Sequence, residues 1–191
     1  DVDDTVLDNS PYEARLIKSG KSYPSGWGDW CNESQAKPLP GVLEFLLKAE
    51  QMGVKIFYVT NRKFEYEKGT LENFKKFGIP IEGDEDSLLM RYENGWDSNK
   101  TSRRELIAKN HRVIFQIGDN LGDFVDLSLS HQSPEKRVEV VNEFNDMWGK
   151  YWFMIENPTY GDWEGALYKF NFDRSNQEII QIRNKKLDEA R

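Results

Sequence analysis

The chain has 191 residues, of which 38% are hydrophobic, and this length allows one domain with a sizeable core but not two large ones. Its 26 basic and 33 acidic side chains give a net charge of -7, which argues against a groove for a nucleic-acid polymer because such a groove needs clustered positive charge. The single cysteine, Cys31, cannot form an intramolecular disulfide, so cysteine usage does not indicate the cellular compartment.

The chain begins with two acidic residues that can act together. In the opening stretch DVDDTVLDNS, Asp1 and Asp3 stand two positions apart at an expected strand end, where alternate side chains point to the same face. One carboxylate can attack phosphorus while the other protonates the leaving oxygen and later activates water, provided that a hard cation holds the group. Acidic pairs beside Thr and Asn also occur in solvated turns and helix caps, so this stretch alone leaves both interpretations open.

The next stretch predicts a helix followed by an aromatic loop. Residues 10–20 indicate a short helix with Ser10 as its N-cap and Gly20 just past its end. Residues 21–38 look irregular and place three aromatic rings among Gly and Pro: Tyr23, Trp27 and Trp30. Such a loop can lie over a site and present its rings to a substrate, or it can pack the same rings against the core.

Helical and extended patterns then alternate along the chain. Helices are expected over residues 40–53, where the pattern is amphipathic, and over residues 64–78 and 101–110, although Gly69 weakens or breaks the second. Strands are expected over residues 55–60, in the LLMR run after Ser87, and over residues 112–117. This order predicts an α/β fold with a Rossmann-like, mostly parallel sheet, helices on both faces and a small helical or loop cap.

Polar residues follow these strands, and ligands bind parallel sheets at the carboxyl ends of the strands. Thr60 and Asn61 can hydrogen-bond phosphate oxygens without adding negative charge. Asp119 and Asp123 form a second acidic pair after the last of these strands. Lys100 can supply the counter-charge to a phosphate, or it can be an exposed residue near a helix start.

The last third of the chain is less regular. Residues 128–152 indicate a polar loop and then a helix with three residues on its buried side: Phe144, Met147 and Trp148. The stretch YWFMIENPTYG predicts a buried strand that ends in a turn, and Tyr160 and Trp163 lie at this turn. From Phe170 to the C-terminus the pattern favours a charged amphipathic helix.

The motifs together resemble a known family. DVDDTVLDN, YVTNR, a lysine and GDNLGDF, in this order and spacing, resemble the haloacid dehalogenase (HAD) superfamily. More narrowly, they are similar to the bacterial class C acid phosphatases with four aspartates, a group that includes the outer-membrane lipoprotein nucleotidases. The stretch ENPTYGDWEGAL resembles the C-terminal NPxYGxWEG segment of that group, so the likeness extends over almost the whole chain.

This resemblance implies a single HAD-like domain over residues 1–191, with cap elements near residues 10–38 and in the C-terminal third. It implies that Asp1 is the nucleophile and Asp3 the acid and base. It also implies that a magnesium ion is held by Asp1, by the backbone oxygen of Asp3 and by Asp119, with Asp123 either as a further ligand or as an anchor that acts through a water molecule. Thr60, Asn61 and Lys100 are then expected to hold the phosphate.

The implied reaction is hydrolysis of phosphomonoesters through an aspartyl-phosphate. Because Asp3 has to carry a proton to act as an acid, we expect a weakly acidic pH optimum. Nucleoside 5′-monophosphates are the first expected substrates, followed by aryl phosphates. The candidates for a pair of rings that clamp a nucleobase are Tyr12, Trp27, Trp30, Tyr160 and Trp163.

The first residues of the chain lack the apolar strand that should deliver Asp1 to the sheet, so we expect this strand upstream of the given sequence. Any signal peptide or lipid anchor is expected there as well. The resemblance implies a location in the bacterial cell envelope, as a periplasmic protein or outer-membrane lipoprotein, or secretion. It also implies a homodimer.

Two alternatives remain open at this point. The same site could transfer the phosphoryl group to an alcohol instead of water. The chain could also be a storage or binding protein that has lost turnover on the same fold, although four intact aspartates speak against this. A mutase or a dehalogenase fits less well, because the second acidic pair and the lysine suit phosphate and Mg²⁺.

Overall fold

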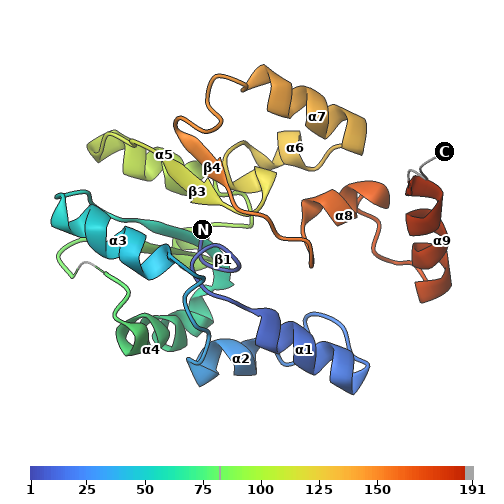
Figure 1. The fold of residues 1–191 in the computed structure, drawn as a ribbon, viewed down its shortest axis with the longest axis horizontal. Coiled ribbons are helices and arrows are strands. Elements are labelled where there is room, and N and C mark those ends of the chain that lie inside the picture. The colour runs from blue at the N-terminus through green and yellow to red at the C-terminus, as the bar shows by residue number, and fades with distance from the viewer. Residues whose placement is uncertain (82, 188–191) are drawn as a thin grey trace. The chain divides into compact units, whose positions relative to one another are not determined.

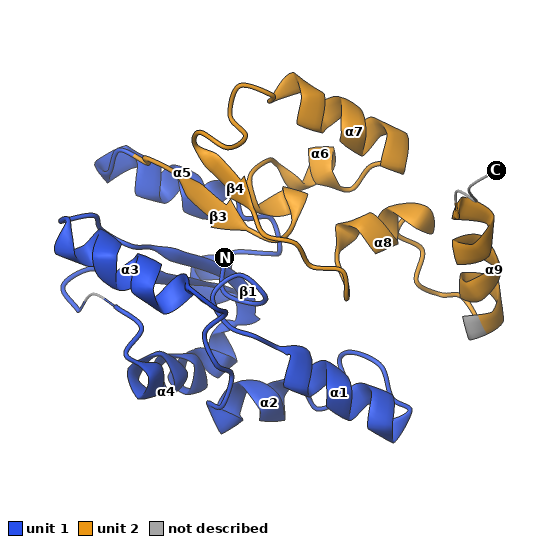
Figure 2. Cartoon of the chain, viewed as in Figure 1, with its two compact units in different colours: residues 1–112 blue, residues 113–191 orange. Residues whose placement is uncertain are grey.

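A computed structural model describes residues 1–81 and 83–187 of the chain. Helices and parallel strands alternate along it, as Figure 1 shows, which confirms the predicted α/β class. The chain divides into two compact units, Asp1–Arg112 and Val113–Arg191 (Figure 2), which we describe separately. The prediction of a single domain stays a prediction. In the described ranges, no helix combines the length and the apolar character that a membrane span requires.

Unit 1 contains a short parallel sheet and most of the long helices. Its elements in chain order are α1 (Ser10–Ser19), α2 (Trp27–Glu33), α3 (Val42–Gln51), β1 (Tyr58–Lys63), η1 (Phe64–Tyr66), α4 (Glu67–Phe77), β2 (Leu88–Arg91), η2 (Glu93–Gly95) and α5 (Thr101–Asn110). β1 pairs with β2 in parallel, with Tyr58 opposite Leu88. The helix α4 connects the two strands, as expected for a parallel pair.

The burial pattern of β1 alternates, and this alternation places the polar residues of the strand. Thr60 and Arg62 are buried, whereas Asn61 and Lys63 are exposed. Successive side chains of a strand point to opposite faces, so Thr60 and Arg62 share the inner face. The strand also extends past residue 60, where the sequence predicts its end, and it is irregular between Val59 and Lys63.

Three local predictions for unit 1 need correction. Residues 27–33 of the expected irregular loop form the helix α2. Ser10 is the first residue of α1, and the N-cap position falls on Asn9, whose side chain does not cap the helix. Gly69 does not break α4, which runs through it. The glycine lies where α2 approaches, and a Cβ atom there would lie 2.6 Å from the carbonyl oxygen of Cys31, so the close contact between the helices requires a residue without a side chain.

Unit 2 has a second parallel pair of strands. Its elements in chain order are β3 (Gln116–Gly118), η3 (Leu121–Asp123), α6 (Leu127–Ser130), α7 (Pro134–Glu143), β4 (Trp152–Met154), α8 (Asp162–Leu167) and α9 (Asn176–Lys186). β3 pairs with β4, with Gln116 opposite Trp152 and Gly118 opposite Met154. The predicted C-terminal helix is confirmed as α9, but it begins at Asn176 and not at Phe170, because residues 170–175 are not helical. Residues 188–191 of that prediction lie outside the described residues.

The core of unit 2 is aromatic. Leu121, Phe124, Val125, Val140 and Trp152 are buried together. Phe144, Met147 and Trp148 pack against this core as expected, but they follow the end of α7 instead of lying on the helix. The strand β4 is less buried than predicted, since Phe153 and Met154 are exposed. This core supports the turn that carries the second acidic pair.

Candidate active site

Asp1 begins a tight loop that turns its chain back on itself. The backbone N–H groups of Val6 and Leu7 both donate to the carbonyl oxygen of Val2, at 2.9 Å each. Asp4 adopts a left-handed conformation with a φ of 54°, which Asp tolerates better than most residues. Val2 and Leu7 are fully buried and anchor the loop, whereas Asp1, Asp3 and Asp4 are only partly buried.

Lys100 pairs with Asp1. The Lys100 Nζ atom lies 2.5 Å from Oδ1 of Asp1, and the two side chains are 6% and 8% exposed. The Thr5 hydroxyl donates to Oδ2 of Asp1 at 3.2 Å. Lys100 stands directly before the first residue of α5, but it is buried, so it is the counter-charge to Asp1 and not an exposed residue near a helix start. A buried cation at this carboxylate suits a group that must approach an anionic phosphate.

Asp3 is held by a buried arginine from β1. The Arg62 Nη2 atom donates to Oδ1 of Asp3 at 2.8 Å, and Nε lies 3.0 Å from Oδ1 and 3.2 Å from Oδ2. The Asn9 amide also donates to Oδ1, at 2.9 Å. The amide is oriented by Trp30, whose indole N–H donates to the Asn9 side-chain oxygen at 2.8 Å. The geometry of Asp3 therefore depends on two residues to which the sequence analysis gave no role.

A second buried arginine supports the predicted phosphate-binding residues. Arg103 donates through Nη1 to the carbonyl oxygen of Thr60 at 2.6 Å and through Nη2 to the side-chain oxygen of Asn61 at 2.8 Å. Burial lowers the pKa of Arg103 to about 10, which still leaves it charged at neutral pH. The Thr60 hydroxyl accepts the backbone N–H of Arg62 at 3.1 Å, and its own proton can serve a phosphate oxygen.

The second acidic pair is arranged by contacts inside unit 2. Asp119 follows β3, and Asn157 donates to its Oδ2 at 2.8 Å. Asp123 accepts the backbone N–H of Asn120 at 2.9 Å in a capping box at the start of η3. The side chain of Asp123 also lies directly against Gly118, where an added Cβ would be only 2.5 Å from the Asp123 Cβ. Gly118 is thus required for the position of Asp123.

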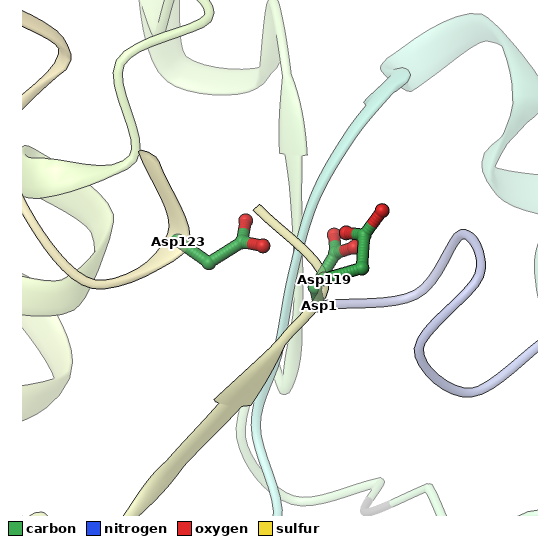
Figure 3. A group of neighbouring side chains, drawn as sticks. All are labelled: Asp1, Asp119 and Asp123. Carbon is green, nitrogen blue, oxygen red and sulfur yellow. The ribbon is translucent and has the colours of Figure 1, made fainter. Parts of the chain in front are cut away.

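Three of the four predicted aspartates form a cluster. Asp1, Asp119 and Asp123 each offer one carboxylate oxygen, and these atoms lie within 4.8 Å of one another (Figure 3). All three residues are partly buried. Carboxylate oxygens are the ligands that Mg²⁺ and Ca²⁺ prefer, so this donor set fits a hard divalent cation. Asp3 was predicted to contribute its backbone oxygen, and that role stays a prediction.

The five aromatic candidates lie in different environments. Tyr12 and Trp30 are buried in the core of unit 1, with 2% and 3% of their surface exposed, and they leave no open ring face for a substrate. Trp27 is partly buried and lies edge-on to Tyr12. In unit 2, Tyr160 is partly buried and Trp163 is 43% exposed. Burial thus speaks against a stacking role for Tyr12 and Trp30.

The turn that carries Tyr160 and Trp163 is well anchored within unit 2. Asn157 accepts the backbone N–H groups of Thr159 and Tyr160, and the indole of Trp163 donates back to the Tyr160 carbonyl. Asp162, the first residue of α8, accepts the Ser130 hydroxyl at 3.1 Å. The segment NPTYGDW is therefore a structured turn that joins the Asp119 partner Asn157 to α8.

Comparison with known proteins identifies the family. The family model described as HAD superfamily, subfamily IIIB (acid phosphatase), matches residues 1–163. The chain belongs to this family of acid phosphatases, which confirms the predicted membership of the HAD superfamily. The class C acid phosphatase from Bacillus anthracis is similar in structure, with a TM-score of 0.90 and 38% identity over 100% of this chain and 78% of that chain. The structure of that enzyme with tungstate bound gives the same values.

More distant relatives come from plants. Acid phosphatase 1 of Solanum lycopersicum is 24% identical over 139 residues, which is 70% of this chain and 53% of the relative. A stem 28 kDa glycoprotein of Glycine max is 25% identical over 131 residues, or 65% of this chain and 50% of the relative. The chain spans about half the length of these curated relatives.

Sequence reasoning identified the acidic residues but missed the polar residues that position them. These are Asn9, Arg62 and Asn157; Arg103, which holds Thr60 and Asn61, was missed as well. Arg62 carried a usable signal, because it stands two positions after Thr60 on a strand and so shares its face. The roles of Asn9 and Asn157 could not be read locally, since polar residues beside turns are common for other reasons.

Proposed function

We propose that the protein is a magnesium-dependent phosphatase that hydrolyses phosphomonoesters through an aspartyl-phosphate on Asp1. The observation that carries this proposal is the acidic cluster of Asp1, Asp119 and Asp123, together with the buried Lys100 on Asp1. A metal and a cation beside a carboxylate suit attack on an anionic phosphate. The tungstate in the B. anthracis relative adds support, because tungstate is a tetrahedral oxyanion like phosphate.

Asp1, Asp119 and Asp123 are the residues that would hold the magnesium ion. When bound, the ion would neutralise charge on the phosphoryl group and on the carboxylates around it. Gly118 and Asn157 would fix the second acidic pair, since one gives Asp123 room and the other donates to Asp119.

The reaction has two halves. In the first, an Asp1 carboxylate oxygen bonds to phosphorus while the bond from phosphorus to the ester oxygen breaks, and Asp3 gives a proton to that oxygen. In the second, the Asp3 carboxylate takes a proton from water as the water oxygen bonds to phosphorus and the bond to Asp1 breaks. Inorganic phosphate is released. Thr60, Asn61 and Lys100 hold the phosphate oxygens, and Arg103 keeps Thr60 and Asn61 in place.

Nucleoside 5′-monophosphates and aryl phosphates are the substrates we propose first. Trp27, Tyr160 and Trp163 remain the candidates for contact with a flat group, because they are not buried in a core. Tyr160→Ala should raise KM for a nucleotide much more than KM for a small alkyl phosphate. Equal increases for both substrates would remove Tyr160 from the proposal.

The deciding experiment measures phosphate release from p-nitrophenyl phosphate and from a nucleoside 5′-monophosphate at pH 5 to 7, with and without EDTA. We expect activity that EDTA removes, that Mg²⁺ restores, and that Asp1→Asn lowers by at least about 10³-fold. We also expect a weakly acidic optimum, so a rate that climbs steadily to pH 9 would contradict the assignment of Asp3. Wild-type protein that binds phosphate and Mg²⁺ without turnover would indicate a binding protein instead.

Transfer to an alcohol is the alternative for the same site. Product analysis with added glycerol distinguishes the two, because a phosphotransferase makes glycerol phosphate at the expense of inorganic phosphate. The cell-envelope location and the homodimer also remain proposals, and both rest on the resemblance of the motifs. Size-exclusion chromatography with light scattering tests the homodimer.

A further inference from the structure

The contacts of Asp3 are distributed unequally between its two carboxylate oxygens. Oδ1 receives three donors, namely Arg62 Nη2 at 2.8 Å, Asn9 Nδ2 at 2.9 Å and Arg62 Nε at 3.0 Å. Among the described residues, Oδ2 receives only the longer branch of the Nε contact, at 3.2 Å. The lone pairs of Oδ1 are therefore occupied, whereas Oδ2 retains room for a proton and a further partner.

The donor that fixes Asp3 is itself held rigidly. Arg62 is 1% exposed, and its Nη1 donates at 3.1 Å to the hydroxyl of Thr70 in α4. That hydroxyl in turn donates to the carbonyl oxygen of Tyr66 at 2.9 Å, which fixes its direction. The guanidinium also lies 5.7 Å from the ring centre of Trp27. The planar group is thus held from β1, α2 and α4 at once.

We propose that Arg62 is the positioning residue for proton transfer by Asp3: with Asn9, it holds Oδ1 and directs Oδ2 to the leaving oxygen. This inference rests on the proposed function, in which Asp3 is the acid. During phosphoryl transfer the proton on Oδ2 moves to the ester oxygen as the bond between that oxygen and phosphorus breaks. The negative charge left on the Asp3 carboxylate is stabilised by the two N–H donors of Arg62.

Only a planar group with several hydrogen-bond donors can hold the Asp3 carboxylate in one orientation. A lysine at position 62 keeps the positive charge, but it offers a single ammonium and cannot donate through Nε and Nη2 at fixed angles. Arg62→Lys is therefore expected to leave the charge in place and to loosen the orientation of the Asp3 carboxylate. An error of about 1 Å in the position of a catalytic group can cost about 10²-fold in rate.

The dependence of the rate on the leaving group separates this role from a purely structural one. A good leaving group such as p-nitrophenolate departs without a proton, whereas an alkoxide has to be protonated as it leaves. We would measure kcat/KM for p-nitrophenyl phosphate, phenyl phosphate and glycerol phosphate, since this constant reports the step that breaks the ester bond. The proteins are the wild type, Arg62→Lys, Asp3→Asn, the double variant and Arg103→Lys.

For Arg62→Lys, we expect a loss of about 10²-fold for glycerol phosphate and less than about 3-fold for p-nitrophenyl phosphate. Asp3→Asn should show the same preference more strongly, and the double variant should show no further selective loss. Arg103→Lys is the matched control. It alters an equally buried arginine that supports Thr60 and Asn61, so it should lower all three constants by similar factors.

Thr70→Val provides a milder test if Arg62→Lys does not fold. It keeps the side-chain shape but removes the oxygen that holds Nη1 of Arg62, and we expect a selective loss of about 3- to 10-fold for glycerol phosphate.

Equal losses across the three substrates in Arg62→Lys, or in Thr70→Val where the former is unfolded, would overturn the positioning role. If Asp3→Asn also shows no leaving-group preference, Asp3 is not the acid and the proposed mechanism fails with the inference. If Asp3→Asn shows the preference and the other variants do not, only the inference fails.

Discussion

The two units hold their acidic residues in different ways. In unit 1, Asp1 and Asp3 are fixed by Lys100 and Arg62, which lie 99 and 59 positions away in the sequence. In unit 2, Asp123 is fixed by the turn in which it stands, through Asn120 and Gly118. The first arrangement forms only when distant segments have packed, whereas the second is largely a property of one short loop.

This difference has a physical basis. In the proposed mechanism, the residues of unit 1 handle charge on the substrate, and buried cations strengthen that function because water screens buried charges little. Burial also means that removing one partner leaves a charge unpaired, which is costly. In the same proposal, the residues of unit 2 need only present two carboxylates at a fixed spacing, and a capping box and a glycine can do that.

Lys100→Met should have the largest effect that follows from this comparison. The substitution leaves the Asp1 carboxylate without its buried cation, and loss of one such charged donor typically lowers kcat by about 10²- to 10³-fold. Lys109→Met, at an exposed position of α5, the helix that follows Lys100, should keep wild-type kcat. Steady-state kinetics at saturating Mg²⁺ checks both. A Lys100→Met enzyme within a factor of three of wild type would show that unit 1 does not depend on the distant lysine.

Gly118→Ala tests the local arrangement of unit 2. The new Cβ would lie 2.5 Å from the Cβ of Asp123, so the carboxylate has to move. We expect affinity for Mg²⁺ to fall by about 10- to 100-fold, as it does when the groups that orient metal ligands are disturbed. Isothermal titration with Mg²⁺ measures this without reference to activity. Gly83→Ala, which meets no atom within 4 Å, is the control and should bind the metal like the wild type.

Gly69→Ala examines the packing on which unit 1 depends. An alanine is favourable in a helix by about 1 kcal/mol, but its Cβ would lie 2.6 Å from the Cys31 carbonyl oxygen and 2.8 Å from the Asn32 Cα. Backbone atoms cannot yield as a flexible side chain can, so we expect net destabilisation of about 1 to 3 kcal/mol. Thermal unfolding should show a Tm lowered by roughly 2 to 12 °C, with Gly83→Ala again as the control. An unchanged Tm would mean that α2 can move away from α4 at little cost.

The same contrast explains what the sequence could predict. The strand patterns and the four aspartates were predictable because alternation and short acidic motifs are local signals. Helix α2 could not be predicted from the sequence. Its seven residues include two tryptophans and a glycine, and its stability comes from the burial of Trp30 and Cys31. Arg62 and Arg103 are present in the sequence, but their roles depend on which oxygen atom, distant in the sequence, each one hydrogen-bonds. For the same reason the sequence left open whether Trp30 faces a substrate or the core, and in the structure its buried indole N–H donates to Asn9.

The smallest effect concerns Cys31, which lies where α2 packs on α4. Burial raises the pKa of its thiol to about 12, although the nearby Arg62 guanidinium lowers it in part. The thiolate is the reactive form, so a thiol reagent should modify the native protein far more slowly than the unfolded chain at pH 8. The residual rate should follow local opening of α2 and should rise in Gly69→Ala, where the contact between the helices is strained. Rapid labelling of the native wild type, with the fold intact by circular dichroism, would mean that α2 opens readily and that the firm packing we assign to unit 1 does not extend to this helix.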